Sequence, residues 1–155
     1  MYLTPHAVLG GIIGERAQNP LIAFVLGFLS HFILDAIPHG DEDIGALKQM
    51  KGEKYYIRLM ISLVFFDTLL ALILFIILSR FGYIENSTSA LSGAIGAMLP
   101  DYLWGVNVFL KSRLLAYKER FHNLIHNPLQ IMMPVWLGVI WQIIFIALCI
   151  KLFVL

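Results

Sequence analysis

The chain has little charge and almost no cysteine. Charged residues make up 14% of its 155 residues, whereas soluble domains carry about 25%. The formal net charge of +1 excludes the electrostatic footprint of a nucleic-acid-binding protein. A single cysteine, Cys149, excludes a disulfide framework within the chain. The first residues also lack a basic region ahead of an apolar core, so they do not predict a cleaved signal peptide.

The chain contains several long apolar segments. Apolar residues make up 59% of the chain, and the mean hydropathy is +0.81. Four long apolar runs cover residues 20–38, 59–78, 89–110 and 128–150. Each reaches about the 20 residues that a helix needs to cross a bilayer core, and in lipid the backbone must satisfy its own hydrogen bonds. We therefore predict an all-α, polytopic membrane helix bundle that forms a single domain over residues 1–155.

A shorter apolar stretch, residues 5–14, precedes the four runs. Thr4 is a good N-cap and Pro5 a good first residue for a short N-terminal helix. This helix is expected either to span the bilayer or to re-enter it. Residues 18–20, Gln-Asn-Pro, then predict a tight turn into the first long helix.

Small residues recur at helical spacing in two of the apolar segments, as Gly10-Gly11-x-x-Gly14 and Gly93-x-x-Gly96. Such steps are typical of helices whose backbones approach closely in a membrane. They do not predict phosphate-binding loops, because no strand precedes either of them. The chain also shows no internal repeat and no low-complexity linker.

The connecting loops set an orientation for the bundle. Eight basic residues fall in the loops 40–58 and 111–127, which four long spans place on one side of the membrane. Only three basic residues fall on the other side. Because basic loops face the cytoplasm, we expect a multi-pass protein of the inner membrane with these two loops in the cytoplasm.

Ionisable residues inside the apolar runs point to a functional site, because burying such groups in a bilayer is costly. They are His31, Asp35, Asp67 and Asp101, joined by His6 if the first segment enters the bilayer. At 1.5 Å per helical residue, His31, Asp67 and Asp101 lie roughly 10, 12 and 13 Å below the cytoplasmic surface. His6 and His31 lie roughly 15 and 16 Å from the turn between the first two helices. We therefore expect these side chains in one layer.

The spacing of the histidines favours a metal site. His31 and Asp35 are four residues apart, as are His122 and His126, so each pair shares one helix face. Pro38 is expected to break the helix and to let His39 turn back toward that face. Pairs at this spacing can chelate one ion. Imidazole together with carboxylate predicts a divalent metal, most of all zinc, with manganese and iron as alternatives.

Several of these residues also have simpler structural explanations. Asp67 can be a protonated carboxyl that bonds across helices, and Asp101 can cap a helix that restarts after Pro100. His126 can flank the last helix without touching a metal. Arg120 can hold an anionic headgroup or only follow the bias of basic residues toward the cytoplasm. A site explains the set better than any member alone, because seven or eight candidates fall in one place.

Three motifs carry a family resemblance: Thr4-Pro5-His6, Ser30-His31-x-x-x-Asp35-x-x-Pro38-His39 and Leu99-Pro100-Asp101. In this order they resemble the membrane-bound metal-dependent hydrolases, also described as LexA-binding, inner-membrane-associated hydrolases. The resemblance covers nearly the whole chain, from His6 to His126. The His-Asp pattern is in turn similar to that of zinc-dependent phospholipase C, which is helical and cleaves phosphodiesters.

The resemblance implies a phosphoesterase-type metal site on a helical membrane scaffold. The implied ligands are His6, His31, Asp35, His39, Asp101 and His122. The late motif departs from the family, because residues 120–123 read Arg-Phe-His-Asn where the family has arginine followed by Thr-His-Ser. His126 is the second candidate ligand in that region.

These observations predict a metal-dependent hydrolase that acts on a lipid or lipid-linked phosphoester. The ion would activate water, Asp67 or Asp101 would orient or deprotonate that water, and Arg120 would hold the headgroup. Three alternatives use the same residues: a transporter or ion or proton conductor, a haem protein, and a structural or partner-binding membrane protein. The missing internal repeat argues against a transporter, and the carboxylates argue against haem.

Overall fold

The computed structural model describes residues 1–40, 48–110 and 133–154, with the backbone alone for 108–110, 152 and 154. Throughout this part of the chain the regular structure is helical and no strand is present, which confirms the all-α prediction. The helices that form the bundle are α1 (Leu3–Ala17), α2 (Pro20–Asp35), α4 (Glu53–Arg80), α5 (Ser87–Leu110) and α7 (Val135–Val154).

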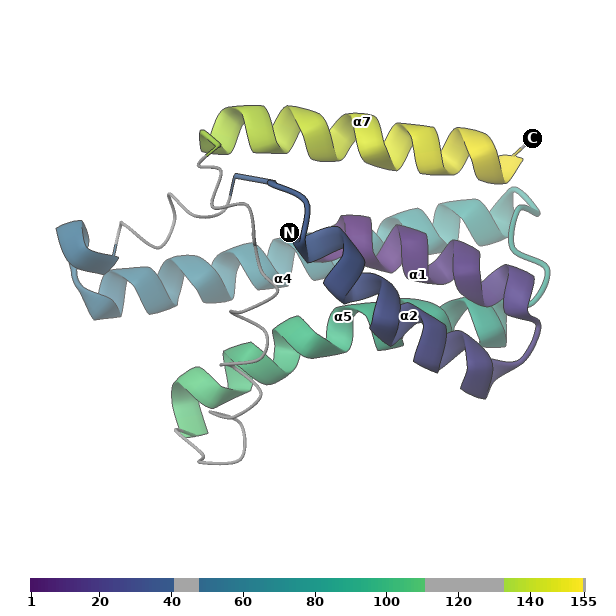
Figure 1. The fold of residues 1–155 in the computed structure, drawn as a ribbon, viewed down its shortest axis with the longest axis horizontal. Helices are drawn as coiled ribbons and strands as arrows, with labels where there is room; N and C mark the ends of the chain where they lie inside the picture. The colour runs from purple at the N-terminus through teal and green to yellow at the C-terminus, as the bar shows by residue number, and fades with distance from the viewer. Residues whose placement is uncertain (41–47, 111–132, 155) are drawn as a thin grey trace.

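The short helix α1 lies at the centre of the bundle and packs against α2, α4, α5 and α7 (Figure 1). Nine of its 15 residues are buried. Since α1 is only about 22 Å long at 1.5 Å per residue, it is shorter than a bilayer core of about 30 Å. The first apolar segment is therefore the interior of the bundle, around which the longer helices are arranged.

The turn predicted at residues 18–20 is present and joins α1 to α2. Gln18 adopts a left-handed conformation with φ 52°, and its N–H donates to Gly14 O over 3.3 Å. Asn19 is the N-cap of α2, and its side-chain oxygen accepts hydrogen bonds from the N–H groups of Leu21 and Ile22 at 3.0 and 3.1 Å. These bonds satisfy two donors that have no partner inside the helix. The chain therefore reverses within two residues, and α1 and α2 pack side by side.

Replacing Asn19 with alanine is expected to lower the free energy of unfolding by about 1 kcal/mol, because both capping bonds are lost. Asn19→Asp is the control, since its carboxylate keeps an acceptor at the same place. Unfolding of the detergent-solubilised protein, followed by circular dichroism, measures the difference. An equal loss in both variants would show that capping is not what Asn19 contributes.

Several helix boundaries differ from the sequence prediction. α4 begins at Glu53, so residues 53–58 of the predicted loop 40–58 belong to a helix. α1 begins at Leu3 with Tyr2 as its N-cap, so Thr4 does not cap it. The Thr4 hydroxyl instead donates to Asp67 of α4. α2 ends at Asp35 and not at residue 38, because the residue before a proline is disfavoured in helical conformation.

α5 runs unbroken from Ser87 to Leu110 with Pro100 inside it. A helix that restarts at Asp101, with the Asp101 side chain as its cap, is therefore not what the structure contains. The carboxylate of Asp101 instead lies near His6 of α1 and His31 of α2.

Glycines allow α1, α2 and α5 to pack with their backbones in contact. A Cβ atom on Gly93 of α5 would collide with the carbonyl oxygen of Gly10 in α1, and one on Gly27 of α2 would collide with the carbonyl oxygen of Gly93. A Cβ on Gly96 would meet Phe24 O in the same way. The predicted role of the two glycine steps in close helix packing is confirmed. This contact brings the three helices that carry His6, His31 and Asp101 together.

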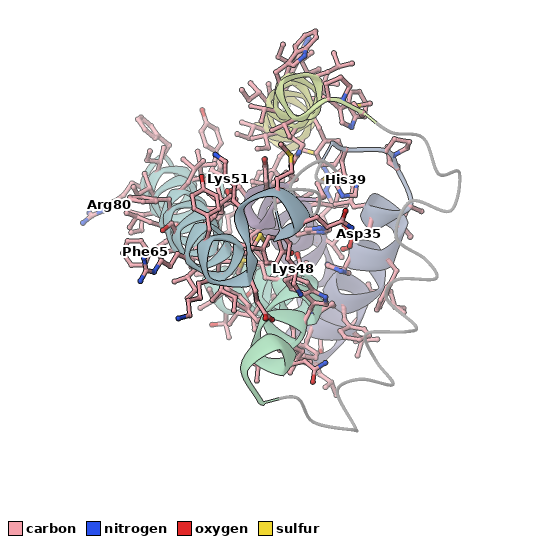
Figure 2. All side chains as sticks on the ribbon, turned by 90° about the vertical axis from the view of Figure 1, so that its left-hand side faces the viewer. Asp35, His39, Lys48, Lys51, Phe65 and Arg80 are labelled. Atoms are coloured by element: carbon pink, nitrogen blue, oxygen red, sulfur yellow. The ribbon has the colours of Figure 1, made fainter. Side chains whose placement is uncertain are left out.

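Polar side chains lie inside the bundle and large apolar side chains lie outside. The largest fully buried side chains are His6, His31, His39, Thr4, Asp35, Pro5, Pro100 and Ser89. In contrast, Leu21 is 75% exposed, Ile33 68% and Phe66 66%. Figure 2 shows Phe65 and Arg80 of α4 pointing away from the bundle. This distribution is the reverse of the usual one in soluble proteins.

One helix in the described part of the chain, α4 with 28 residues, is long and apolar enough to cross a membrane. It contains the predicted run 59–78. α2 and the segment Val135–Lys151 of α7 are apolar but shorter. The structure therefore supports membrane association through α4.

Candidate metal centre

The imidazole rings of His6 and His31 are stacked in the centre of the bundle. Their centroids lie 4.3 Å apart and the ring planes differ by 27°. His6 comes from α1 and His31 from α2, and both side chains are fully buried. The depth count along the two antiparallel helices predicts these rings side by side, and the structure places them so.

Asp35 lies directly beside both rings. One carboxylate oxygen, Oδ1, is 3.1 Å from His6 Nε2, and the other, Oδ2, is 3.0 Å from His31 Nε2. The Asp35 side chain is 2% exposed. Because Asp35 follows His31 by one helical turn, α2 alone fixes the position of this carboxylate relative to one of the two imidazoles.

Asp101 of α5 lies near the same nitrogen atoms of the two imidazoles. Its Oδ2 is 3.9 Å from His6 Nε2, and its Oδ1 is 3.8 Å from His31 Nε2. Its side chain is 23% exposed, whereas those of His6, His31 and Asp35 are almost completely buried. Asp101 is therefore on the accessible side of the cluster.

The hydrogen bond at the other ring nitrogen of His31, Nδ1, fixes the orientation of this imidazole. His31 Nδ1 is 2.9 Å from the carbonyl oxygen of Ala97, which can only accept a hydrogen bond. The proton is therefore on Nδ1, and in the neutral ring the Nε2 lone pair faces the carboxylates of Asp35 and Asp101. A ring nitrogen donating to a backbone carbonyl is the usual support of a metal-ligating histidine. Because His31 Nε2 and the carboxylate oxygens of Asp35 and Asp101 are all hydrogen-bond acceptors, a cation between them is favoured.

The distances between these nitrogen and oxygen atoms can be compared with those around a bound divalent ion. With bonds of 2.0–2.2 Å, two ligands at tetrahedral or octahedral angles lie about 2.8–3.6 Å apart. Asp35 already meets this spacing with both imidazoles, and Asp101 is only about 0.3 Å beyond it. Ligand atoms of His6, His31 and Asp101 all lie within 4.8 Å of one another. The two imidazoles and Asp101 could thus hold a divalent metal ion, and Asp35 lies beside both imidazoles while its Oδ1 also accepts from the Met1 amino group.

His39 joins the edge of the cluster through the start of the chain. The Met1 amino group donates to Asp35 Oδ1 over 2.7 Å and lies 2.6 Å from His39 Nε2. His39 Nδ1 is 2.6 Å from Ile37 O, which fixes the ring. Figure 2 shows Asp35 and His39 together within the bundle. His39 thus turns back toward the face of α2 that carries Asp35, as the sequence predicts.

Gln142 of α7 is a site-supporting residue that the sequence analysis did not identify. Its side-chain oxygen accepts from Tyr2 N at 3.0 Å, and its Nε2 donates to His39 O over 3.1 Å. Gln142 is buried. An amide in the middle of an apolar segment is the signal that could have pointed to it, since a polar group there needs a partner.

Asp67 lies apart from the two imidazoles. Its Oδ2 accepts from Thr4 N at 3.0 Å, and its Oδ1 accepts from the Thr4 hydroxyl. The bonding across helices that the sequence left open for Asp67 is therefore present. The remaining predicted residues, Arg120, His122 and His126, lie outside the described residues.

Comparison of the chain with protein-family models, with curated proteins and with solved structures finds no match. The resemblance to metal-dependent membrane hydrolases therefore stays a prediction from the motifs. A function for the chain must be inferred from the geometry of the cluster and from the apolar surface of the bundle.

Proposed function

We propose that the protein is a metal-dependent membrane hydrolase that cleaves a lipid or lipid-linked phosphoester. One observation carries the proposal. Two stacked imidazoles and two carboxylates, drawn from α1, α2 and α5, converge on one small volume, and His31 is oriented by a backbone carbonyl as metal-ligating histidines are. Ionisable groups buried in this way are costly unless they serve a site.

His6, His31, Asp35 and Asp101 would hold the ion, most of all zinc, with manganese or iron as alternatives. The ion would make a bound water acidic and polarise the scissile phosphoryl group. His39 supports the cluster from its edge, and His122 or His126 would complete it. Arg120 would bind the anionic headgroup with charge-assisted hydrogen bonds.

Asp101 is the best candidate to orient the attacking water and accept its proton. It is the farther of the two carboxylates from the imidazoles, and it is the one with an exposed face. A general base must lie within hydrogen-bond reach of the water that it deprotonates. Asp35 is almost completely buried beside both imidazoles, and Asp67 accepts hydrogen bonds from Thr4, so Asp101 is the carboxylate of the cluster that water reaches.

A lipid is the substrate class that suits the outer surface. The exposed faces of α2, α4, α5 and α7 carry large apolar side chains, and contiguous apolar surface of this kind is rare on soluble monomers. We infer a polytopic bundle in the inner membrane, with the basic segments 40–58 and 111–127 on the cytoplasmic side. A substrate entering sideways from the leaflet would then reach the exposed face of Asp101.

The experiment is a metal count and an activity assay on the same detergent-solubilised protein. We expect bound zinc, manganese or iron in stoichiometric amount, and phosphate or phosphoalcohol release from mixed phospholipid micelles that a chelator stops. Added metal should restore the activity. Wild-type protein that carries no metal, or that turns over lipid equally well with chelator, would contradict the proposal. Ion flux in proteoliposomes without lipid breakdown would instead support the transporter.

A further inference from the structure

α4 makes few buried contacts with the bundle that it belongs to. Ala71 is its only buried residue within Glu53–Arg80, and Phe65 and Phe66 are more than 60% exposed. Apolar packing alone therefore gives α4 little to fix its height or rotation. Two consecutive polar residues at its middle, Asp67 and Thr68, make the specific contacts instead.

Asp67 holds the beginning of α1. The first N–H groups of a helix have no partner inside it, and Tyr2, the N-cap of α1, provides no side-chain cap. The Asp67 carboxylate takes over that task from another helix, because it accepts from both Thr4 N and the Thr4 hydroxyl. A negative charge at this end also complements the helix dipole. Thr4 precedes His6 by two residues.

Thr68 holds α5 beside Asp101. The Thr68 hydroxyl donates to Val64 O over 2.6 Å, so its proton is used within α4. The 2.7 Å contact between Thr68 Oγ1 and the Tyr102 hydroxyl is then a hydrogen bond that Tyr102 donates. Tyr102 is the next residue after Asp101. One side of α4 thus contacts the two helices that carry His6 and Asp101.

His6 depends on such an external support more than His31 does. His31 Nδ1 is fixed by Ala97 O. His6 Nδ1 is buried and has no hydrogen-bond partner within residues 1–40, 48–110 and 133–154. The position of the His6 ring is therefore set by the position of α1 itself and by stacking on His31.

We propose that Asp67 and Thr68 form a two-point bracket on α4 that sets the distance between His6 and Asp101, which is 3.9 Å in the structure. Both are positioning residues, because Asp67 acts through Thr4 and Thr68 acts through Tyr102. The proposal rests on the metal site proposed above, and it assigns Asp67 a role other than that of the base.

Cobalt is the probe, because the visible absorption of bound Co²⁺ reports the arrangement of its ligands. Full-length protein in detergent is stripped of metal and titrated with Co²⁺. The variants are Asp67→Asn, Thr68→Val and Tyr102→Phe. Thr68→Ser keeps the hydroxyl, and Ser79→Ala removes a hydroxyl from the same helix that has no partner in the described part of the chain. These last two are the controls.

We expect each of the three bracket variants to weaken cobalt binding about 10–100-fold, as loss of a supporting partner does at other metal sites, and to shift the absorption band. Combining Thr68→Val with Tyr102→Phe should add nothing to either change, because both remove the same hydrogen bond. Both controls should match the wild type. A change that reflected only helix stability would lower the unfolding temperature without moving the band.

The outcomes separate the two proposals. Wild-type protein that binds no cobalt would overturn the metal site and the bracket with it. If the wild type binds cobalt, and Thr68→Val and Tyr102→Phe bind it with the same affinity and the same absorption band, the bracket alone would be overturned. The Thr68 and Tyr102 variants keep the test decisive if Asp67→Asn fails to fold, because neither changes the Asp67 carboxylate that holds the start of α1.

Discussion

Replacing Asp35 with asparagine is expected to lower metal affinity by more than about 100-fold, beyond the effect of losing an outer-shell partner. Each oxygen of this carboxylate lies 3.0–3.1 Å from an imidazole nitrogen, which is the distance expected between two ligands of one ion. The amide keeps the shape of the side chain but loses the negative charge and replaces one acceptor with a donor. Chelator-sensitive lipid turnover should be lost together with the metal.

Glu53→Gln is the matched control for Asp35→Asn. It makes the same chemical change at the start of α4, where Glu53 is exposed and 3.8 Å from Lys48. Surface pairs of this kind contribute little, so metal content and turnover should stay at the wild-type level. Mass spectrometry measures the metal content of both variants and so shows whether Asp35 is needed for metal binding. Full metal content in Asp35→Asn would remove Asp35 from the ligand set.

Replacing Gly93 with alanine is expected to destabilise the bundle by about 1–3 kcal/mol or more, the usual range for overpacking. The added Cβ would collide with the Gly10 carbonyl in α1. Because the clash is with backbone, no side-chain rotation can relieve it. Separating α5 from α1 also moves Asp101 away from His6, so metal affinity should fall with stability.

Gly105→Ala provides the control on the same helix. Among the residues that the structure describes, a Cβ on Gly105 would meet nothing within 4 Å. Alanine in a helix interior is favoured over glycine by roughly 0.5–1 kcal/mol, so this variant should be as stable as the wild type or more so. Unfolding in detergent measures both variants. Equal stabilities for Gly93→Ala and Gly105→Ala would mean that α1 and α5 are not in backbone contact.

Much of the fold follows from local signals in the sequence. The Gln-Asn-Pro turn and the apolar run inside α4 each predict their structure correctly, because each depends on neighbouring residues alone. The glycine steps correctly predict close helix packing, although the sequence does not show which helices meet there. Helix geometry of 1.5 Å per residue also predicts His6 and His31 side by side once the turn is known. The stacked rings at 4.3 Å agree with that count.

The parts that the sequence does not predict depend on contacts between distant residues. Thr4 has the chemistry of an N-cap, but its hydroxyl binds Asp67, 63 residues further along the chain. Gln142 bonds to Tyr2 and His39, more than 100 residues away. The count of residues along α4 predicts only the depth of Asp67, which is the depth of the histidines. The rotation of α4 about its axis cannot be counted in this way, and it directs Asp67 to Thr4.

The central place of α1 has a consequence for assembly in the membrane. Of the described helices, α1 leaves the ribosome first, yet it buries its polar side chains against α2, α4, α5 and α7, all made later. Until α5 arrives, His6 lacks Asp101, and until α7 arrives, the segment around His39 lacks Gln142. The nascent protein must therefore hold an incomplete, polar helix until α7 has been made, and the proposed metal site cannot form before α5 is in place.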